Sequence, residues 1–125
     1  GLWGLKLGIP VLTIDRVMRH TPKILAALGV EYLQAEEFGI EAQRRILQVV
    51  GDQPTWLFCD GGSKRSEFRE IGPLMPSGSI VTAHDLGVEF RHEVDAADLC
   101  PHIFTPVNQE WWMELNVQLA IYQRS

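Results

Sequence analysis

Short apolar runs that alternate with helical patterns restrict most strongly what this chain can fold into. Four short runs rich in apolar residues end at or shortly before an acidic residue, at 10–15, 30–34, 55–60 and 79–85. Runs of this kind are typical of strands covered on both faces of a sheet. Between them, apolar residues at helical spacing and capping residues predict helices over 21–28, 39–50 and 63–74. The pattern therefore predicts an α/β protein.

The order of these elements also predicts how the strands pair. Strands that alternate with helices form parallel sheets through right-handed crossovers, which brings their carboxyl ends to one edge. In the last third of the chain, a short helix over 95–99 is followed by two apolar runs, at 103–107 and 117–122, that look like an antiparallel pair. We therefore expect a Rossmann-like, mostly parallel sheet with helices on both faces and an antiparallel C-terminal hairpin at one edge.

Composition restricts the functional class. The chain has 125 residues, 46% of them hydrophobic, which suits one domain with a real core. A net charge of −5 and scattered basic residues argue against a nucleic-acid surface. The apolar runs are too short to cross a bilayer and no secretory start is visible, so we expect a cytoplasmic protein without membrane contact. Cys59 lies in an apolar run and is expected to be a buried reduced thiol, not the disulfide partner of Cys100.

Acidic residues follow the predicted strands. Asp15, Glu36 with Glu37, Asp60 and Asp85 each come at or just after a strand's end. The fold would gather them at one edge of the sheet, where carboxylates can accept ribose hydroxyls or hold a divalent cation. The alternative is that strand-to-helix turns favour acidic residues as helix caps. For the set as a whole, we expect a ligand site.

The order of the predicted elements, over most of the chain, resembles class I S-adenosylmethionine-dependent methyltransferases, in particular the small-molecule O-methyltransferase and cephalosporin-hydroxylase-like branch. Leu57-Phe58-Cys59-Asp60-Gly61-Gly62-Ser63 is similar to that family's fourth strand and the acidic turn after it. The stretch from Leu74 to Asp85, which contains Pro76-Ser77-Gly78 and ends in His84-Asp85, is similar to the loop and strand that follow. The resemblance implies methyl transfer from S-adenosylmethionine to an oxygen of a small-molecule substrate.

The resemblance also implies roles for individual residues. Asp15 would bind the cofactor ribose, and Glu36 or Glu37 would lie beside the adenine, with Asp60 and Gly61 in the turn against the cofactor. The ligands of Mg²⁺ or another divalent cation would be Asp60, His84 and Asp85. Lys64 and His84 are the candidates for a catalytic base, although a solvated first-turn lysine and a structural strand-end histidine are the simpler interpretations.

One departure from the family concerns the start of the sequence. The family's first strand and its glycine-rich turn should precede the first helix, whereas here residues 1–8 resemble only the tail of that helix. The absent strand is central in the family, and its neighbours would keep unpaired backbone groups. We therefore expect a fragment or a truncated gene product, direct pairing of the two neighbouring strands, or a homodimer in which a second copy covers the gap.

Two other functional classes remain open from the sequence. A non-catalytic binding or dimerisation module would keep the fold without the reaction, and the missing glycine turn favours it. A receiver-type signalling domain would need an acidic pair after its first strand, which is absent here. Trp111 and Trp112 could line an acceptor pocket, but we expect them to pack in the core or at an interface.

Overall fold

The computed structural model describes residues 11–15, 30–34, 39–60, 63–114 and 118–125. The chain divides into two compact units, Gly1–Gly51 and Asp52–Ser125, and each is described by itself. In the part of the chain that the structure describes, no helix is long and apolar enough to cross a membrane.

Among its described residues, the first unit contains a parallel strand pair and one helix. Strand β1 (Val11–Asp15) pairs with β2 (Val30–Gln34) in the register Val11↔Val30 to Asp15↔Gln34. Helix α3 (Ile40–Val50) buries Ala42 and Ile46, which lie one turn apart on one face. The helix ends at Gly51, whose positive φ of 59° suits glycine. The predicted strands and helix are confirmed here, and the helix predicted over 21–28 lies outside the described residues.

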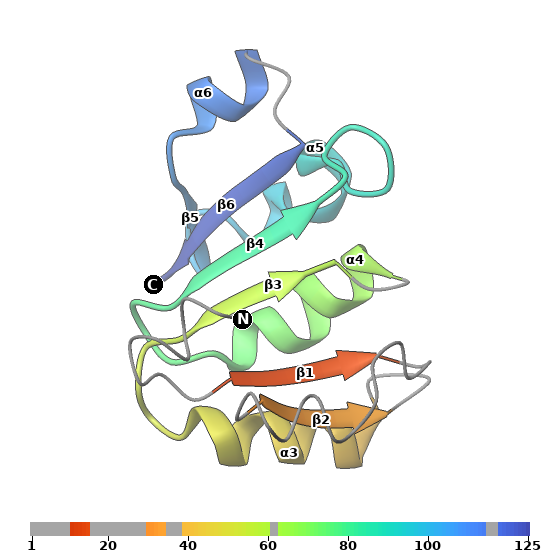
Figure 1. The fold of residues 1–125 in the computed structure, drawn as a ribbon. Helices are drawn as coiled ribbons and strands as arrows, with labels where there is room; N and C mark the ends of the chain where they lie inside the picture. The colour runs from red at the N-terminus through yellow and green to blue at the C-terminus, as the bar shows by residue number, and fades with distance from the viewer. Residues whose placement is uncertain (1–10, 16–29, 35–38, 61–62, 115–117) are drawn as a thin grey trace. The chain divides into compact units, whose positions relative to one another are not determined.

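The second unit is built on an open, mixed four-stranded sheet in the order β3-β4-β6-β5 (Figure 1). Strand β3 (Trp56–Cys59) is parallel to β4 (Ile80–His84). Strand β6 (Leu119–Arg124) lies antiparallel between β4 and β5 (Phe104–Pro106). The predicted antiparallel pair is thus confirmed, with its second strand beside β4 and its first strand outermost. One of the three pairings in this sheet is parallel.

Three short helical segments connect β3 to β4. They are α4 (Lys64–Ser66), a π-helical turn over Glu67–Ile71 and a 3₁₀ turn over Gly72–Leu74. Phe68 is fully buried, and its ring centroid lies 4.7 Å from that of Phe104 and 4.9 Å from that of Tyr122. The alternate residues Val81, Ala83, Ala120 and Tyr122 are also buried, as expected of one face of a sheet. The core of the unit therefore lies between this face and the connecting segments.

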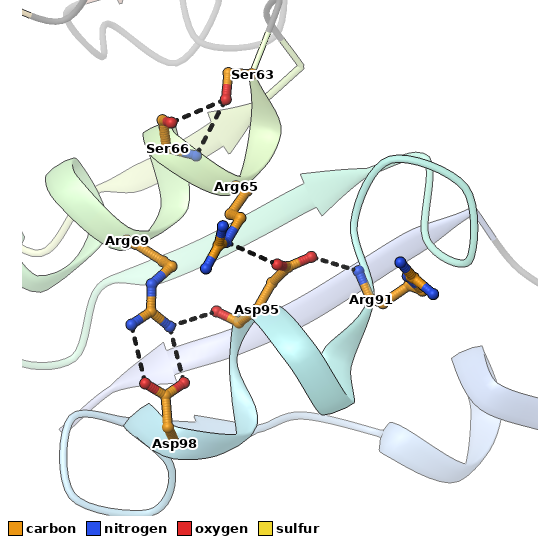
Figure 2. A network of polar contacts seen from close by, with 7 residues as sticks. All are labelled: Ser63, Arg65, Ser66, Arg69, Arg91, Asp95 and Asp98. Atoms are coloured by element: carbon orange, nitrogen blue, oxygen red, sulfur yellow. Dashed lines mark hydrogen bonds and ion pairs between the residues drawn. The ribbon is translucent and has the colours of Figure 1, made fainter.

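A network of charged side chains joins α4 and the π-helical turn to α5 (His92–Asp95) and the 3₁₀ turn Ala97–Leu99 (Figure 2). The buried carboxylate of Asp95 accepts a hydrogen bond of 2.8 Å from the backbone N–H of Arg91 and lies 3.0 Å from Arg65 Nε. Arg69 donates to both carboxylate oxygens of Asp98, at 2.8 and 2.9 Å, and to the backbone carbonyl of Asp95. These contacts fix the helical segment that begins at Lys64 to α5 and to the 3₁₀ turn after it.

Helix α6 (Gln109–Glu114) carries the two adjacent tryptophans. Trp112 is buried, donates a hydrogen bond of 2.7 Å from Nε1 to the Val107 carbonyl, and lies 5.8 Å from Tyr122 between ring centroids. Trp111 is 46% exposed. Packing in the core is confirmed for Trp112 alone, because neighbouring residues on a helix point in directions about 100° apart.

Candidate metal centre

Three predicted ligands meet where β3 and β4 end. Asp60 follows β3 directly, His84 is the last residue of β4, and Asp85 comes next. The two strands are parallel and in the register Cys59↔Ala83, so their carboxyl ends lie side by side. The parallel pairing therefore brings together side chains from two separate parts of the sequence.

The donor atoms of these residues converge on one point. His84 Nδ1 lies 3.1 Å from Asp60 Oδ1 and 3.1 Å from Asp85 Oδ1, and one ligand atom from each residue lies within 4.8 Å of the others. The exposed fractions of the side chains are 48% for Asp60, 35% for His84 and 27% for Asp85. The cluster is accessible to a small ion or ligand, while His84 Nδ1 itself is shielded from solvent.

The imidazole nitrogen gives a test of whether these residues fit a metal ion. His84 Nδ1 is buried and makes no properly oriented hydrogen bond with any described residue, although two carboxylate oxygens are close. Buried polar atoms in folded proteins nearly always have a partner. A cation between the nitrogen and the two carboxylates would satisfy all three groups, so the donor set fits a divalent ion.

The backbone of Asp85 is held in an uncommon conformation. Its φ is 58°, in the left-handed region that aspartate tolerates better than most residues. Its carbonyl oxygen accepts backbone hydrogen bonds of 3.0, 3.0 and 3.2 Å from Val88, Glu89 and Phe90. The turn therefore closes on Asp85 and brings the Glu89 side chain back toward the site.

Lys64 lies behind Asp85 and is buried, with 8% of the residue exposed. Its Nζ is 3.1 Å from Asp85 Oδ2 and also contacts Glu89 Oε2. Hydrogen bonding to Glu89, with a further contribution from Asp85, raises the pKa of Lys64. Lys64 in turn holds the pKa of the Asp85 carboxyl below its usual range, with a smaller contribution from His84. A catalytic-base role for Lys64 stays a prediction, and it would require the ammonium to leave both carboxylates.

Apolar surface adjoins the cluster on β3. The Phe58 ring centroid is 6.4 Å from that of His84, and the Trp56 centroid is 6.4 Å from that of Phe58. Trp56 Nε1 donates a hydrogen bond of 3.1 Å to Thr82 Oγ1, while 72% of the tryptophan stays exposed. These contacts put Trp56, Phe58 and His84 on one face of the β3–β4 pair.

The structure describes only part of the predicted cofactor site. Asp15 is the last residue of β1, opposite Gln34 of β2, in the other compact unit. Glu36, Glu37 and Gly61 lie outside the described residues. Their cofactor roles, and that of Asp15, remain predictions.

Sequence reasoning missed Glu89. It stands apart from any predicted strand end and follows Gly87, whose φ is 89°. The one available signal was Gly87 itself, because a glycine shortly after a strand end marks a turn that can reverse the chain.

No protein-family model matches this chain, and no curated protein is significantly similar to it in sequence. The resemblance to methyltransferases accordingly stays a prediction.

Proposed function

We propose that Asp60, His84 and Asp85 bind a divalent cation, and that the chain is a methyltransferase-like domain for O-methyl transfer from S-adenosylmethionine to a small molecule. The observation that carries the proposal is the convergence of three donor atoms within 4.8 Å around an imidazole nitrogen that has no hydrogen bond among the described residues. The proposal includes a Rossmann-like fold of the kind that this methyltransferase class has.

The donor set indicates which cation is preferred. Mg²⁺ and Ca²⁺ favour oxygen ligands, whereas imidazole suits first-row transition ions. One nitrogen of His84 with carboxylates of Asp60 and Asp85 therefore favours Mn²⁺, Fe²⁺, Co²⁺ or Zn²⁺ over Mg²⁺. Three protein ligands would also leave coordination positions open for a substrate oxygen.

The proposed reaction moves one methyl group. The bond between the cofactor sulfur and the methyl carbon breaks, a bond from that carbon to the acceptor oxygen forms, and the acceptor hydroxyl gives up its proton. Polarisation of that hydroxyl is the chemistry that a divalent ion supplies at such a site. The two roles expected for His84 compete, because a lone pair that binds a cation cannot also accept the proton. Phe58 and Trp56 offer apolar surface beside the site for the rest of the acceptor.

The Rossmann-like class is proposed on the pairing of the strands. Both β1–β2 and β3–β4 are parallel, and β6 is antiparallel beside β4. A mostly parallel sheet covered by helices on both faces, with one antiparallel strand near its end, would account for these pairings. Acidic residues at carboxyl ends of its strands would then line the usual ligand edge of such a sheet.

A non-catalytic interaction module is the second candidate. The observation that favours it is the exposure of Trp56 on β3, which is the end strand of the four-stranded sheet. Exposed aromatic residues on an outer strand are common features of association surfaces. In this reading the chain would use β3 to bind another chain, including a second copy of itself, without catalysis.

The first test is calorimetric titration of the 125-residue chain with Mn²⁺, and then with S-adenosylhomocysteine in the presence and absence of Mn²⁺. Binding of both, with dissociation constants below about 100 μM, would support the proposal. Binding of Mn²⁺ alone would support the cation site and argue against the methyltransferase reading. No heat with either at millimolar concentration would overturn both parts.

Matched variants identify the site. His84→Ala should abolish Mn²⁺ binding because it removes the nitrogen donor. Asp98→Asn is the control, since it removes one exposed carboxylate that pairs with Arg69 instead. Equal loss of Mn²⁺ binding in both variants would mean that binding does not depend on this cluster in particular.

A further inference from the structure

The carboxylate of Asp85 is divided between two cationic or potentially cationic groups. Its Oδ1 lies 3.1 Å from His84 Nδ1, and its Oδ2 lies 3.1 Å from Lys64 Nζ. One oxygen therefore faces the cluster with Asp60, and the other faces the buried ammonium.

Lys64 is held in place from several directions. Lysine is rarely this buried unless it is paired, and its contacts to Asp85 and Glu89 supply that pairing. Arg65, the next residue, lies 3.0 Å from the buried carboxylate of Asp95. The turn that closes on the Asp85 carbonyl fixes Glu89 on the other side. The ammonium, the carboxylate and the turn thus support one another.

We infer that Lys64 is a positioning residue that makes Asp85 a one-oxygen ligand and thereby sets which cation the cluster accepts. The inference rests on the cation site proposed above. Calcium takes six to eight oxygen ligands and often uses both oxygens of one carboxylate, while smaller ions need fewer ligands in stricter geometry. With Oδ2 occupied by Lys64, Asp85 presents Oδ1 alone. The cluster therefore discriminates against Ca²⁺ and in favour of ions such as Mn²⁺.

The test compares the affinities for Mn²⁺ and Ca²⁺ in the wild-type chain and in Lys64→Met, which keeps an unbranched chain as far as Cε and removes the ammonium group. Removal of the positive charge of Lys64 should strengthen the binding of both metal ions by electrostatics. The ratio of the two affinities is therefore the informative quantity. We expect the preference for Mn²⁺ over Ca²⁺ to fall by roughly fivefold or more, because Asp85 gains a second free oxygen. The Mn²⁺ electron paramagnetic resonance spectrum should change with the altered ligation.

Glu89→Gln is the matched control. It removes one carboxylate that contacts Lys64 and leaves the contact between Lys64 and Asp85, so the preference should stay within about twofold of wild type. Should Lys64→Met fail to fold, the double variant Lys64→Met with Glu89→Gln avoids an unpaired Glu89 charge. It is expected to show the same loss of preference.

The outcomes separate this inference from the proposed function. If the wild-type chain binds Mn²⁺ and the variants without Lys64 keep its preference, the positioning role is wrong and the cation site stands. If the wild-type chain binds no divalent ion, the site itself is wrong and the inference falls with it. A loss of preference in Glu89→Gln equal to that in Lys64→Met would also overturn the inference, because the contact between Lys64 and Asp85 would then not be the cause.

Discussion

His84 Nδ1 lies 3.1 Å from Asp60 Oδ1, at the ends of two parallel strands. The contact joins residues that lie on either side of the whole helical connection between β3 and β4. It exists because the register of the strands places their carboxyl ends together, and it makes Asp60 the natural position at which to separate ligand binding from folding.

Asp60→Asn should therefore affect the bound state alone. The Asp60 side chain is about half exposed, so without metal the free energy of unfolding should change by less than about 0.5 kcal/mol. For the wild-type chain, Mn²⁺ at a hundred times its dissociation constant should add about 2.7 kcal/mol. In the variant most of that gain should vanish. Thermal unfolding with and without Mn²⁺ measures both quantities, and a variant that is unstable without metal would identify Asp60 as a structural cap.

Asp95→Ala should destabilise the second unit. The buried carboxylate accepts a hydrogen bond from the Arg91 backbone N–H and pairs with Arg65, so its removal leaves a partly buried donor without this partner. The expected loss is roughly 2 kcal/mol. Urea unfolding provides the measurement, with Asp98→Ala as the control. The Asp98 carboxylate is more than half exposed, and its loss should have a clearly smaller effect. Equal losses of stability in the two variants would contradict the deeper burial of Asp95 than of Asp98.

Asp98 should contribute to the pH dependence of stability. The Arg69 guanidinium holds the pKa of the Asp98 carboxyl below its usual range. A carboxyl whose pKa is lowered by folding stabilises the protein above its unfolded pKa and loses that contribution as pH falls through the folded pKa. The difference in stability between wild type and Asp98→Asn should thus be largest near pH 7 and shrink below about pH 4. Urea titrations across this range check the prediction, and added salt should reduce the difference because the pair is exposed.

Gly72→Ala should destabilise the core despite alanine's higher helix propensity. A Cβ atom at Gly72 would lie 2.9 Å from Phe104 Cζ, which is too close for an undistorted contact. We expect a net loss of about 1–2 kcal/mol, after a propensity gain of under 1 kcal/mol. A double-mutant cycle with Phe104→Leu tests the cause, because the smaller side chain should remove part of the penalty. Additive effects would show that the contact with Phe104 is not responsible.

Cys59 should be unreactive in the folded protein. Burial raises the pKa of the Cys59 thiol, with a smaller contribution from the charge of Glu67, so the thiolate is scarcely formed near neutral pH. Labelling with Ellman's reagent should modify Cys59 only after unfolding in urea, whereas the partly exposed Cys100 should react in the native state, at a rate slowed by its own raised pKa. The variants Cys59→Ser and Cys100→Ser assign the two rates, and rapid native labelling of Cys59 would contradict its burial.

The strands and the ligand cluster were accessible to sequence reasoning for different reasons. Short runs rich in apolar and β-branched residues, bounded by turn residues, predict β1 to β4. The meeting of Asp60 and Asp85 could be predicted because parallel pairing places strand ends together whatever the side chains are, whereas His84 entered the predicted ligand set through the resemblance to methyltransferases. The helical segment after Ser63 could be located, although its π-helical and 3₁₀ geometry depends on packing around Phe68.

Other features depended on contacts that no local pattern encodes. The sequence by itself determined the α/β pattern and the acidic residues at the strand ends, because each follows from periodicity and turn chemistry. Only the tertiary structure decided that β6 lies between β4 and β5, that Trp112 and not Trp111 enters the core, and that Lys64 contacts Asp85 and Glu89. The physical reason is that these arrangements join residues distant along the chain, where shape and charge pairing decide and local propensity does not.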